Sequence, residues 1–447
     1  MLDKEPNVSG LFYTKEPKVL SQEIETLLST AAINPSKEIN MILVPHAGYM
    51  YSAEIAAAAF KACSGKQIKT VLILAPSHFS CFKGIAIWPE GTFTTPLGRI
   101  VVNKSLCRAL LKESPYVQNL KEPFEKEHSL EVELPFVQKT FPEATLVPLL
   151  TGQMSLEDCE CFATSLKKVL KNSKNTLIII SSDFSHFHNE STANLMDETA
   201  LSLIEDCNTK KLWEYSLLKT VEMCGIIGTT IALFYAEKAK VNHVTVLKKG
   251  NSSKTTLNPS RVVGYAAVAF QPKELNKHQK KTLLSIARAT LENTFQLYQE
   301  KDLRLCSKEG VFVTLYLEKN LRGCMGEVFS NTPLYETVHK MTLCSASDSR
   351  FPPLTQKEKK EVKIEISLLS TPKKIESFQE IKLGTHGVII IQNNKKGLFL
   401  PQVATETGWS LEELLSELCV QKANLPPLAW QSKETSIYIF SSEIFGD

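Results

Sequence analysis

Short apolar runs alternate with longer amphipathic stretches between about residue 41 and residue 270. The apolar runs, each rich in Leu and β-branched residues, are MILVP (41–45), TVLILAP (70–76), ATLVPLL (144–150) and NTLIII (175–180). Continuous apolar strands of this kind belong in sheets that are covered on both faces. Helical patterns lie between them, as at 53–64 and 158–173, and RVVGYAAVAF (261–270) predicts a last strand. The alternation predicts a layered α/β domain.

A polar, charged stretch at 271–280 separates this part from a second one, and we place the boundary near Pro272. The predicted domains therefore span residues 1–272 and 273–447. The second part has helical patterns at 280–301 and 410–423, with Ser410 as N-cap of the later helix. Its strand-like runs are 311–318, 363–370 and 387–392. Because strands and helices do not alternate regularly here, we expect a smaller α+β domain.

Polar groups follow three of the apolar runs at the point where each strand should end. MILVP leads into His46, TVLILAP into Ser77 and His78, and NTLIII into SSDFSH, which holds Asp183 and His186. If the strands are parallel, these groups meet at one edge of the sheet, outside the carboxyl ends of the strands. His and Asp are common ligands of first-row metals. One such histidine is usually an ordinary polar residue, but three strand ends in one domain favour a metal site.

Two further residues in the first part have a structural and a functional interpretation. Cys224 lies at the predicted start of a buried helix, where the helix dipole favours the metal-binding thiolate, although a lone cysteine most often simply packs. His128 opens HSLEVELPF, so Glu131 or Glu133 could orient it as a base. It could equally belong to the polar first turn of a helix.

The ordered motifs PHAGYMYS, PSHF, EHSLEVELPF, SSDFSHF and MCG resemble the Memo family over roughly residues 5–270. The resemblance implies a fold similar to class III extradiol dioxygenases, which use non-haem iron. It also implies a metal pocket formed by His46, His78 and Cys224. Asp183, His186 and His128 would line the same pocket as catalytic groups. A sulfur ligand admits copper or zinc beside iron, so iron is the expected metal and the other two are alternatives.

The second part has its own candidate residues. LRGCMG places Arg322 and Cys324 beside glycines, where the arginine could hold an anion or lower the thiol pKa; a tight turn is the alternative. In SASDSRFPPLT, Asp348 and Arg350 could form a site, or a local salt bridge that fixes a loop. With EISLLS, LPQVATETGW and CVQKA, these motifs resemble the AMMECR family over roughly residues 275–445. That resemblance transfers no settled activity.

The two resemblances together imply a fusion of two components of the AmmeMemoRadiSam system. Fusion raises the effective concentration of one component near the other. The chain has no CxxxCxxC motif, so a radical SAM partner would be a separate protein.

Composition narrows the remaining choices. With 51 Lys and Arg against 48 Asp and Glu, the net charge of +3 argues against a nucleic-acid partner. No apolar run reaches the roughly 18 residues of a membrane span. The 11 cysteines, without a CxxC pair, fit reduced thiols in the cytoplasm.

Three functions follow from the predicted pocket. The first is a metal-dependent redox enzyme, similar to a dioxygenase, that acts on a small molecule or a peptide. The second is a catalytically silent binding or adaptor module that recruits a radical SAM protein or a peptide. The third is a metal-dependent hydrolase with an activated water.

Overall fold

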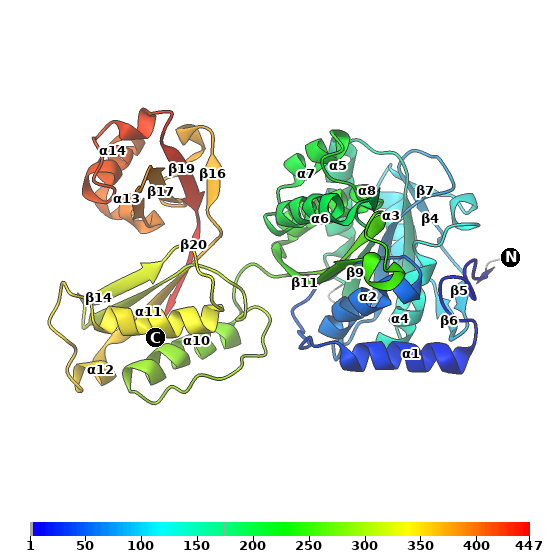
Figure 1. Cartoon of the computed structure of the whole chain (residues 1–447), viewed down its shortest axis with the longest axis horizontal. Coiled ribbons are helices and arrows are strands. Elements are labelled where there is room, and N and C mark those ends of the chain that lie inside the picture. Colours follow the sequence, from blue (N-terminus) through cyan, green and yellow to red (C-terminus); the bar gives the residue numbers. More distant parts are fainter. Residues whose placement is uncertain (1–2, 174) are drawn as a thin grey trace. The chain divides into compact units, whose positions relative to one another are not determined.

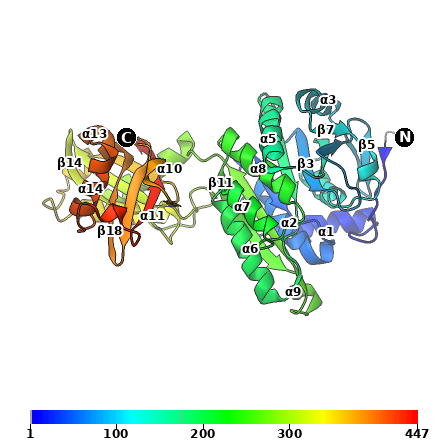
Figure 2. The same ribbon diagram turned by 90° about the horizontal axis from the view of Figure 1, so that it is seen from above.

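The computed structural model describes residues 3–173 and 175–447. The chain divides into two compact units, Met1–Lys273 and Glu274–Asp447, and each is described by itself. Figures 1 and 2 show the elements of both units in two views.

The first unit is built on a mixed sheet, which has nine strands in the part of the chain that the structure describes. Their order is β10-β12-β2-β9-β3-β8-β4-β7, and β11 pairs with β12. The central strands β2 (Met41–Val44), β9 (Thr176–Ser181), β3 (Thr70–Pro76) and β8 (Thr145–Thr151) are parallel neighbours. The flanking strands are β10 (His186–His188), β11 (His243–Asn251), β12 (Val262–Gln271), β4 (Ile85–Ile87) and β7 (Val117–Asn119). The four apolar runs thus form the parallel strands that the sequence predicts.

Helices cover both faces of this sheet, as the continuous apolar strands require. One layer holds α1 (Pro17–Thr30), α2 (Tyr49–Cys63) and α4 (Leu134–Thr140), and the other holds α3 (Lys104–Glu113), α5 (Leu156–Leu170) and α8 (Ile226–Ala239) (Figure 1). Helix α6 (Glu190–Glu205) packs on β11 and β12, and α7 (Thr209–Leu217) packs on α6 and α8. A small separate sheet pairs β1 (Asp3–Lys4), β5 (Thr92–Thr95) and β6 (Gly98–Val101), and α9 (Ser253–Thr256) is a single turn.

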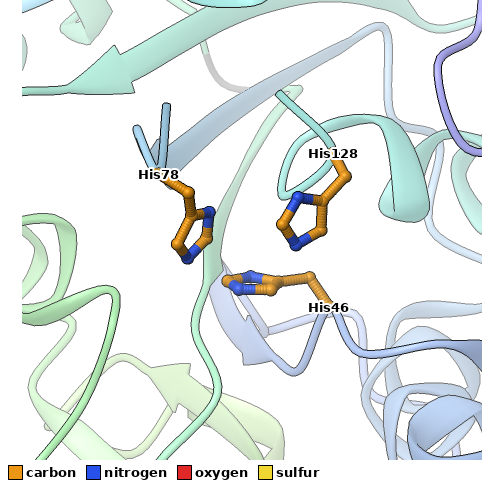
Figure 3. Close-up of side chains that lie close together, drawn as sticks. All are labelled: His46, His78 and His128. Carbon is orange, nitrogen blue, oxygen red and sulfur yellow. The ribbon is translucent and has the colours of Figure 1, made fainter. Parts of the chain in front are cut away.

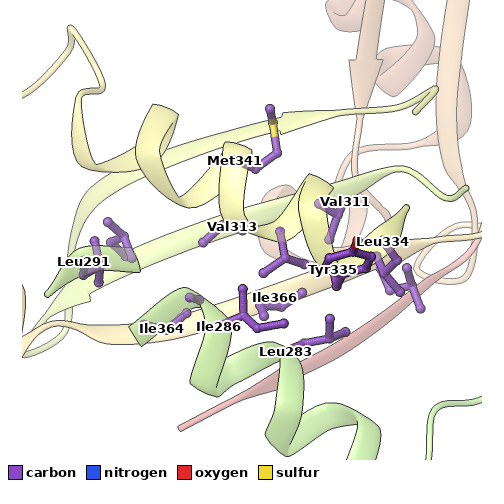
Figure 4. Packing of buried hydrophobic residues seen from close by; sticks show 14 of the residues in the cluster. Leu283, Ile286, Leu291, Val311, Val313, Leu334, Tyr335, Met341, Ile364 and Ile366 are labelled. Carbon is purple, nitrogen blue, oxygen red and sulfur yellow. The ribbon is translucent and has the colours of Figure 1, made fainter. Parts of the chain in front are cut away.

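The second unit contains two four-stranded sheets in its described residues. The first is β14 (Asn320–Glu327), β13 (Val311–Leu317), β15 (Lys363–Leu369) and β20 (Ser442–Gly446). Helices α10 (Lys277–Leu291) and α11 (Leu334–Ala346) pack on it around a core that includes Leu283, Val313 and Ile366 (Figure 4). The second sheet is β16 (Lys373–Ile375), β19 (Ser436–Phe440), β17 (Gly387–Gln392) and β18 (Lys395–Phe399). Helices α13 (Pro401–Thr407) and α14 (Leu411–Gln421) contact this sheet, and α12 (Glu358–Glu361) is one turn.

Helix ends show where local sequence decides the structure. Ser410 caps α14 in a reciprocal pair with Glu413, as the sequence predicts. The predicted helix at 280–301 is too long, because α10 ends at Leu291. Asn293 adopts a left-handed φ of 59°, and the next amide, of Thr294, bonds back to the helix. A left-handed residue just past the last turn is a common helix stop, and the apolar pattern beyond it does not reveal it.

Candidate metal centre

The three polar strand ends of the first unit lie at the same edge of the sheet. Strand β9 pairs in parallel with β2 on one side and with β3 on the other. His46 follows β2, His78 follows β3, and Asp183 follows β9, each two residues beyond the last strand residue. The prediction that these chain segments converge is confirmed, because parallel neighbours end on one edge.

Three histidines form a cluster there. His46, His78 and His128 each offer a ring nitrogen, and these atoms lie within 4.8 Å of one another. The rings point toward each other, with centroids 5.3 Å apart for His46 and His78 and 4.8 Å apart for His78 and His128 (Figure 3). Only 2% of His46 is exposed, whereas the side chain of His78 is 30% exposed. The cluster is therefore buried on one side and accessible on the other.

A buried carboxylate, Glu127, holds two of these rings. Its Oε1 lies 3.0 Å from Nδ1 of His78 and 3.3 Å from Nδ1 of His128. It also accepts hydrogen bonds from the backbone amides of His78, His128 and Ser129. Burial by itself would raise the pKa of Glu127, but the hydrogen bonds from His78 lower it to about 2. An ionised carboxylate thus fixes the orientation of both imidazoles.

Sequence reasoning missed Glu127, and the suggestion that Glu131 or Glu133 orients His128 was wrong. Glu131 accepts hydrogen bonds from the amides of Asn7 and Val8 instead, so it ties down the N-terminal segment. Glu133 contacts Ser181 at the end of β9. The sequence signal that could have identified Glu127 is its position directly before His128 in EHS. In a turn, adjacent side chains can lie close together, and here both lie beside His78.

His46 is held by two groups from the end of β9. Its Nδ1 lies 2.7 Å from Oγ of Ser181, and its backbone amide donates to Asp183 at 2.9 Å. In each of the three histidines, Nδ1 thus has a protein partner and Nε2 is the remaining donor atom. Burial lowers the pKa of His46 and of His128, which favours the neutral imidazole that binds metals.

Asp183 and His186 lie beside the cluster but do not belong to it. Burial raises the pKa of Asp183 to about 7, against hydrogen bonds from the backbone of His46 and Ala47 that lower it. Asp183 therefore positions the backbone of the loop after β2. His186 is half-buried at the start of β10, and burial lowers its pKa.

Cys224 touches one member of the cluster. Its Sγ lies 3.2 Å from Nε2 of His46 and accepts the backbone amide of Asp183 at 3.1 Å. The next residue, Gly225, caps α8 and lies so close to the end of β9 that an added Cβ would come within 2.6 Å of the backbone of Ser181. Only glycine permits this approach, which explains why MCG ends in Gly.

The expectation that the helix dipole favours a Cys224 thiolate is not met in the metal-free protein. Burial, and then the negative charge of Asp183, raise the pKa of this thiol well above its ordinary value. Removal from water disfavours the charged thiolate at this position. A metal ion bound to this sulfur would reverse the balance, because a coordinating thiol is deprotonated.

In the second unit, LRGCMG forms part of strand β14 and is not a tight turn. Gly323 and Gly326 have ordinary φ values, and close packing is what requires glycine at both positions. Arg322 does not face a free anion site, because it pairs with Glu358 at 3.0 Å and donates to the carbonyl of Pro352.

Asp348 and Arg350 form the local salt bridge that the sequence suggests, with 2.7 Å between Nη2 and Oδ2. Together they bracket Cys324: Asp348 accepts its amide, and Arg350 donates to its carbonyl, both at 3.0 Å. The thiol of Cys324 accepts from Thr314 on the paired strand. The four candidate residues of this unit therefore have structural partners that join the loop at 345–355 to β14.

We expect Asp348→Ala to lower the free energy of unfolding of the second unit by about 2–4 kcal/mol, because the amide of Cys324 and the amide and guanidinium of Arg350 lose a charged acceptor. The hydrogen bond from Arg350 holds the pKa of Asp348 below its usual range. Its stabilisation is thus present above pH about 3.9 and is lost as the pH falls below that value. Hydrogen exchange of residues 320–350 at pH 7 and during acidification measures both effects. The surface pair Lys340–Glu327 offers the control, since solvent screens it and Lys340→Ala should change the stability little; an equal loss of stability in both variants would contradict the prediction.

The fold and the cluster define an α/β unit with three converging histidines at a sheet edge, joined to a second unit of α+β type whose two sheets are antiparallel. Residues 4–269 match the family model for Memo-like proteins, and residues 284–445 match the model named AMMECR1. The chain belongs to the Memo family and carries an AMMECR1 domain after the Memo domain.

Curated relatives match the first part over almost their whole length. A MEMO1 family protein of Thermotoga neapolitana is 33% identical over 274 residues, which are 59% of this chain and 97% of the relative. A MEMO1 family protein of Aquifex aeolicus is also 33% identical, over 60% of this chain and 98% of the relative.

Among solved structures, an uncharacterized protein from Pyrococcus horikoshii is 36% identical, with a TM-score of 0.36, and the match covers 39% of this chain and 93% of that protein.

None of the helices in the described part of the chain has both the length and the apolar composition that are needed to cross a bilayer.

Proposed function

We propose that the Memo domain binds one transition-metal ion at the histidine cluster and uses it in redox chemistry on a small molecule or a peptide. The observation that carries the proposal is the arrangement of His46, His78 and His128. Their donor atoms lie within 4.8 Å, and each Nδ1 already has a protein partner. Imidazoles held in this way present Nε2 to a common point, which is the usual form of a metal site.

The donor set fits a first-row metal. Neutral imidazole suits iron, copper and zinc. In a tetrahedral site, nitrogen and sulfur ligands of one ion lie about 3.6 Å apart, and Sγ of Cys224 is 3.2 Å from Nε2 of His46. Cys224 is therefore proposed as a ligand together with His46 and His78, as the family resemblance implies, and His128 as a further donor. We propose iron as the metal, because of the resemblance to non-haem iron dioxygenases.

When bound, the metal would supply a Lewis acid and a route for electrons. The residues of this chain have separate tasks. Glu127 and Asp183 hold the histidines in place, and His186, half-buried beside the cluster, is proposed to transfer protons to and from the substrate. The partial exposure of His78 leaves a side from which substrate can enter.

A metal-dependent hydrolase is the second candidate, because three imidazoles are also the ligand set of zinc sites that activate water. Metal analysis of protein purified without oxygen separates the candidates. Near-stoichiometric iron or copper, with activity that requires oxygen, supports the redox enzyme. Zinc with activity that does not require oxygen supports the hydrolase, and protein that binds no metal would leave the adaptor module.

We expect Cys224→Ser to weaken metal binding by roughly 100-fold or more, since the loss of a ligand should exceed the cost of losing a residue that only orients one, and to remove the sulfur-to-metal charge-transfer absorption of protein loaded with Co²⁺. Absorption titration with Co²⁺ measures both. The exposed Cys161 on α5 provides the control, and Cys161→Ser should bind as the unaltered protein does. An unchanged spectrum in Cys224→Ser would leave the histidines as the ligands and exclude the thiolate.

We further propose that this fusion acts in the cytoplasm as part of an AmmeMemoRadiSam system, with a separate radical SAM protein as partner. The support is the combination of a Memo domain and an AMMECR1 domain in one chain. Calorimetric titration of the full chain with the radical SAM protein from the same genome tests this. Saturable binding is expected, and the absence of heat at micromolar concentrations of both proteins would contradict it.

A further inference from the structure

Glu133 is a buried carboxyl group to which the proposed chemistry gives no task. It lies at the end of the short 3-10 helix Glu131–Glu133 and directly precedes α4. Its exposed fraction is 0%, and Oε1 lies 3.1 Å from Oγ of Ser181. Within the described residues, its second oxygen, Oε2, has no hydrogen-bond partner. Placing a carboxyl group here is costly, so its single contact matters.

The contacts of Ser181 determine the direction of each hydrogen bond. Three polar atoms surround its Oγ: the carbonyl oxygen of Ser129 at 2.7 Å, Nδ1 of His46 at 2.7 Å, and Oε1 of Glu133 at 3.1 Å. A hydroxyl group has one proton to donate and two lone pairs that accept. The carbonyl of Ser129 can only accept, so it takes the hydroxyl proton. The imidazole and the carboxyl group must then both donate to Ser181.

A carboxyl group that donates a hydrogen bond must be protonated, and the surroundings of Glu133 favour the protonated form. A buried carboxylate with one neutral hydrogen-bond partner is unstable relative to the acid. Burial raises the pKa of Glu133 well above its ordinary value, and the nearby Asp183 raises it further, although the hydrogen bond with Ser181 acts in the opposite direction. The unpaired Oε2 is then a neutral carbonyl oxygen, which tolerates the absence of a partner better than an anionic oxygen does.

We propose that Glu133 is a positioning residue that acts as a neutral hydrogen-bond donor to Ser181 and thereby fixes His46 with its proton on Nδ1. Nε2 of His46 is then left with its lone pair facing the cluster. This relay sets the tautomer of the most buried histidine, as Glu127 orients the other two. Its consequence for metal binding rests on the proposed function, but the tautomer itself does not.

The test compares Glu133→Gln, which keeps a neutral donor of the same shape, with Glu133→Leu, which removes it. Long-range ¹H–¹⁵N NMR of the metal-free full chain reads the His46 tautomer, and competition with a chromogenic chelator measures Zn²⁺ affinity. We expect a protonated Nδ1 and a bare Nε2 in the unaltered protein and in Glu133→Gln, with Zn²⁺ affinities within about threefold. In Glu133→Leu we expect a mixture of tautomers and a Zn²⁺ affinity lower by roughly 10–100-fold.

Two further variants keep the test decisive. Ser181→Ala removes the middle of the relay and should also give a mixture of tautomers. It therefore replaces Glu133→Leu in the test if that variant does not fold. Glu131→Gln alters a neighbouring buried carboxylate that holds the amides of Asn7 and Val8, so it should change stability and not the tautomer.

The outcomes separate this inference from the proposed function. A proton on Nε2 of His46 in the unaltered protein overturns the relay, whether or not Zn²⁺ binds. Equal losses of the Nδ1 tautomer and of Zn²⁺ affinity in Glu133→Gln and Glu133→Leu also overturn the relay, because a charged carboxylate would then be required in place of a neutral donor. The expected tautomer without Zn²⁺ binding contradicts the metal site and leaves the relay standing.

Discussion

Replacing His46 with alanine is expected to abolish stoichiometric metal binding, with an affinity lower by roughly 100-fold or more. Loss of a ligand should exceed the 10–100-fold cost of losing a residue that only orients one. His46 is central because it is the most buried histidine of the cluster and contacts both Ser181 and Cys224. Metal analysis after dialysis against a weak chelator, together with Zn²⁺ titration, measures the effect.

The control for this prediction is His278→Ala. His278 is exposed on α10 of the second unit, so its loss should leave metal content unchanged. Thermal unfolding of His46→Ala without metal should show a loss of about 1–3 kcal/mol, since Ser181 loses a buried partner. A folded His46→Ala protein that retains its full metal content would remove the basis of the proposed function.

Replacing Glu127 with alanine is expected to weaken metal binding by roughly 10–100-fold and to lower the free energy of unfolding by about 3–5 kcal/mol. One carboxylate, with a side chain 1% exposed, contacts both His78 and His128 and also accepts backbone amides. Its removal frees two imidazoles and leaves buried donors without an acceptor.

Glu127→Gln should lower metal affinity and the free energy of unfolding less than Glu127→Ala does, because an amide oxygen still accepts one hydrogen bond. Chemical denaturation and Zn²⁺ titration of both variants measure these two losses. Glu122→Ala is the control: the carboxylate of Glu122 is exposed and accepts a hydrogen bond from the hydroxyl of Ser80, so its loss should change neither quantity appreciably. If Glu127→Ala binds metal with unaltered affinity, the rings do not depend on this carboxylate for their orientation.

The sequence predicted the elements of the first unit well because their apolar runs are long and distinct. Each run is followed directly by its polar residues, so the placement of His46, His78 and Asp183 at strand ends could be predicted with the strands. The partner of His128 could not, because Glu127, Glu131 and Glu133 all lie within five residues of it. Which of them turns toward the ring depends on the path of the loop and on what packs there.

The second unit also has one feature that local sequence predicts and one that depends on contacts with distant segments. The capped start of α14 follows from Ser410 and Glu413, which interact within one turn. The glycines of LRGCMG left a tight turn open as an alternative, but they serve close packing in β14, against Ser345 and Phe312 from other segments. Glycine permits both structures, and only the neighbouring segments distinguish them.

Local hydrophobic periodicity was enough to predict the four central strands, the last strand β12, helices α2 and α5 and the polar residues at the strand ends. The tertiary structure alone decided that His128 joins His46 and His78, that Glu127 holds two rings, and that Glu133 reaches Ser181. These are contacts between segments far apart in the chain, set by the parallel order β2-β9-β3 and by burial. Hydrogen-bond direction and protonation follow from that burial, which no local pattern encodes.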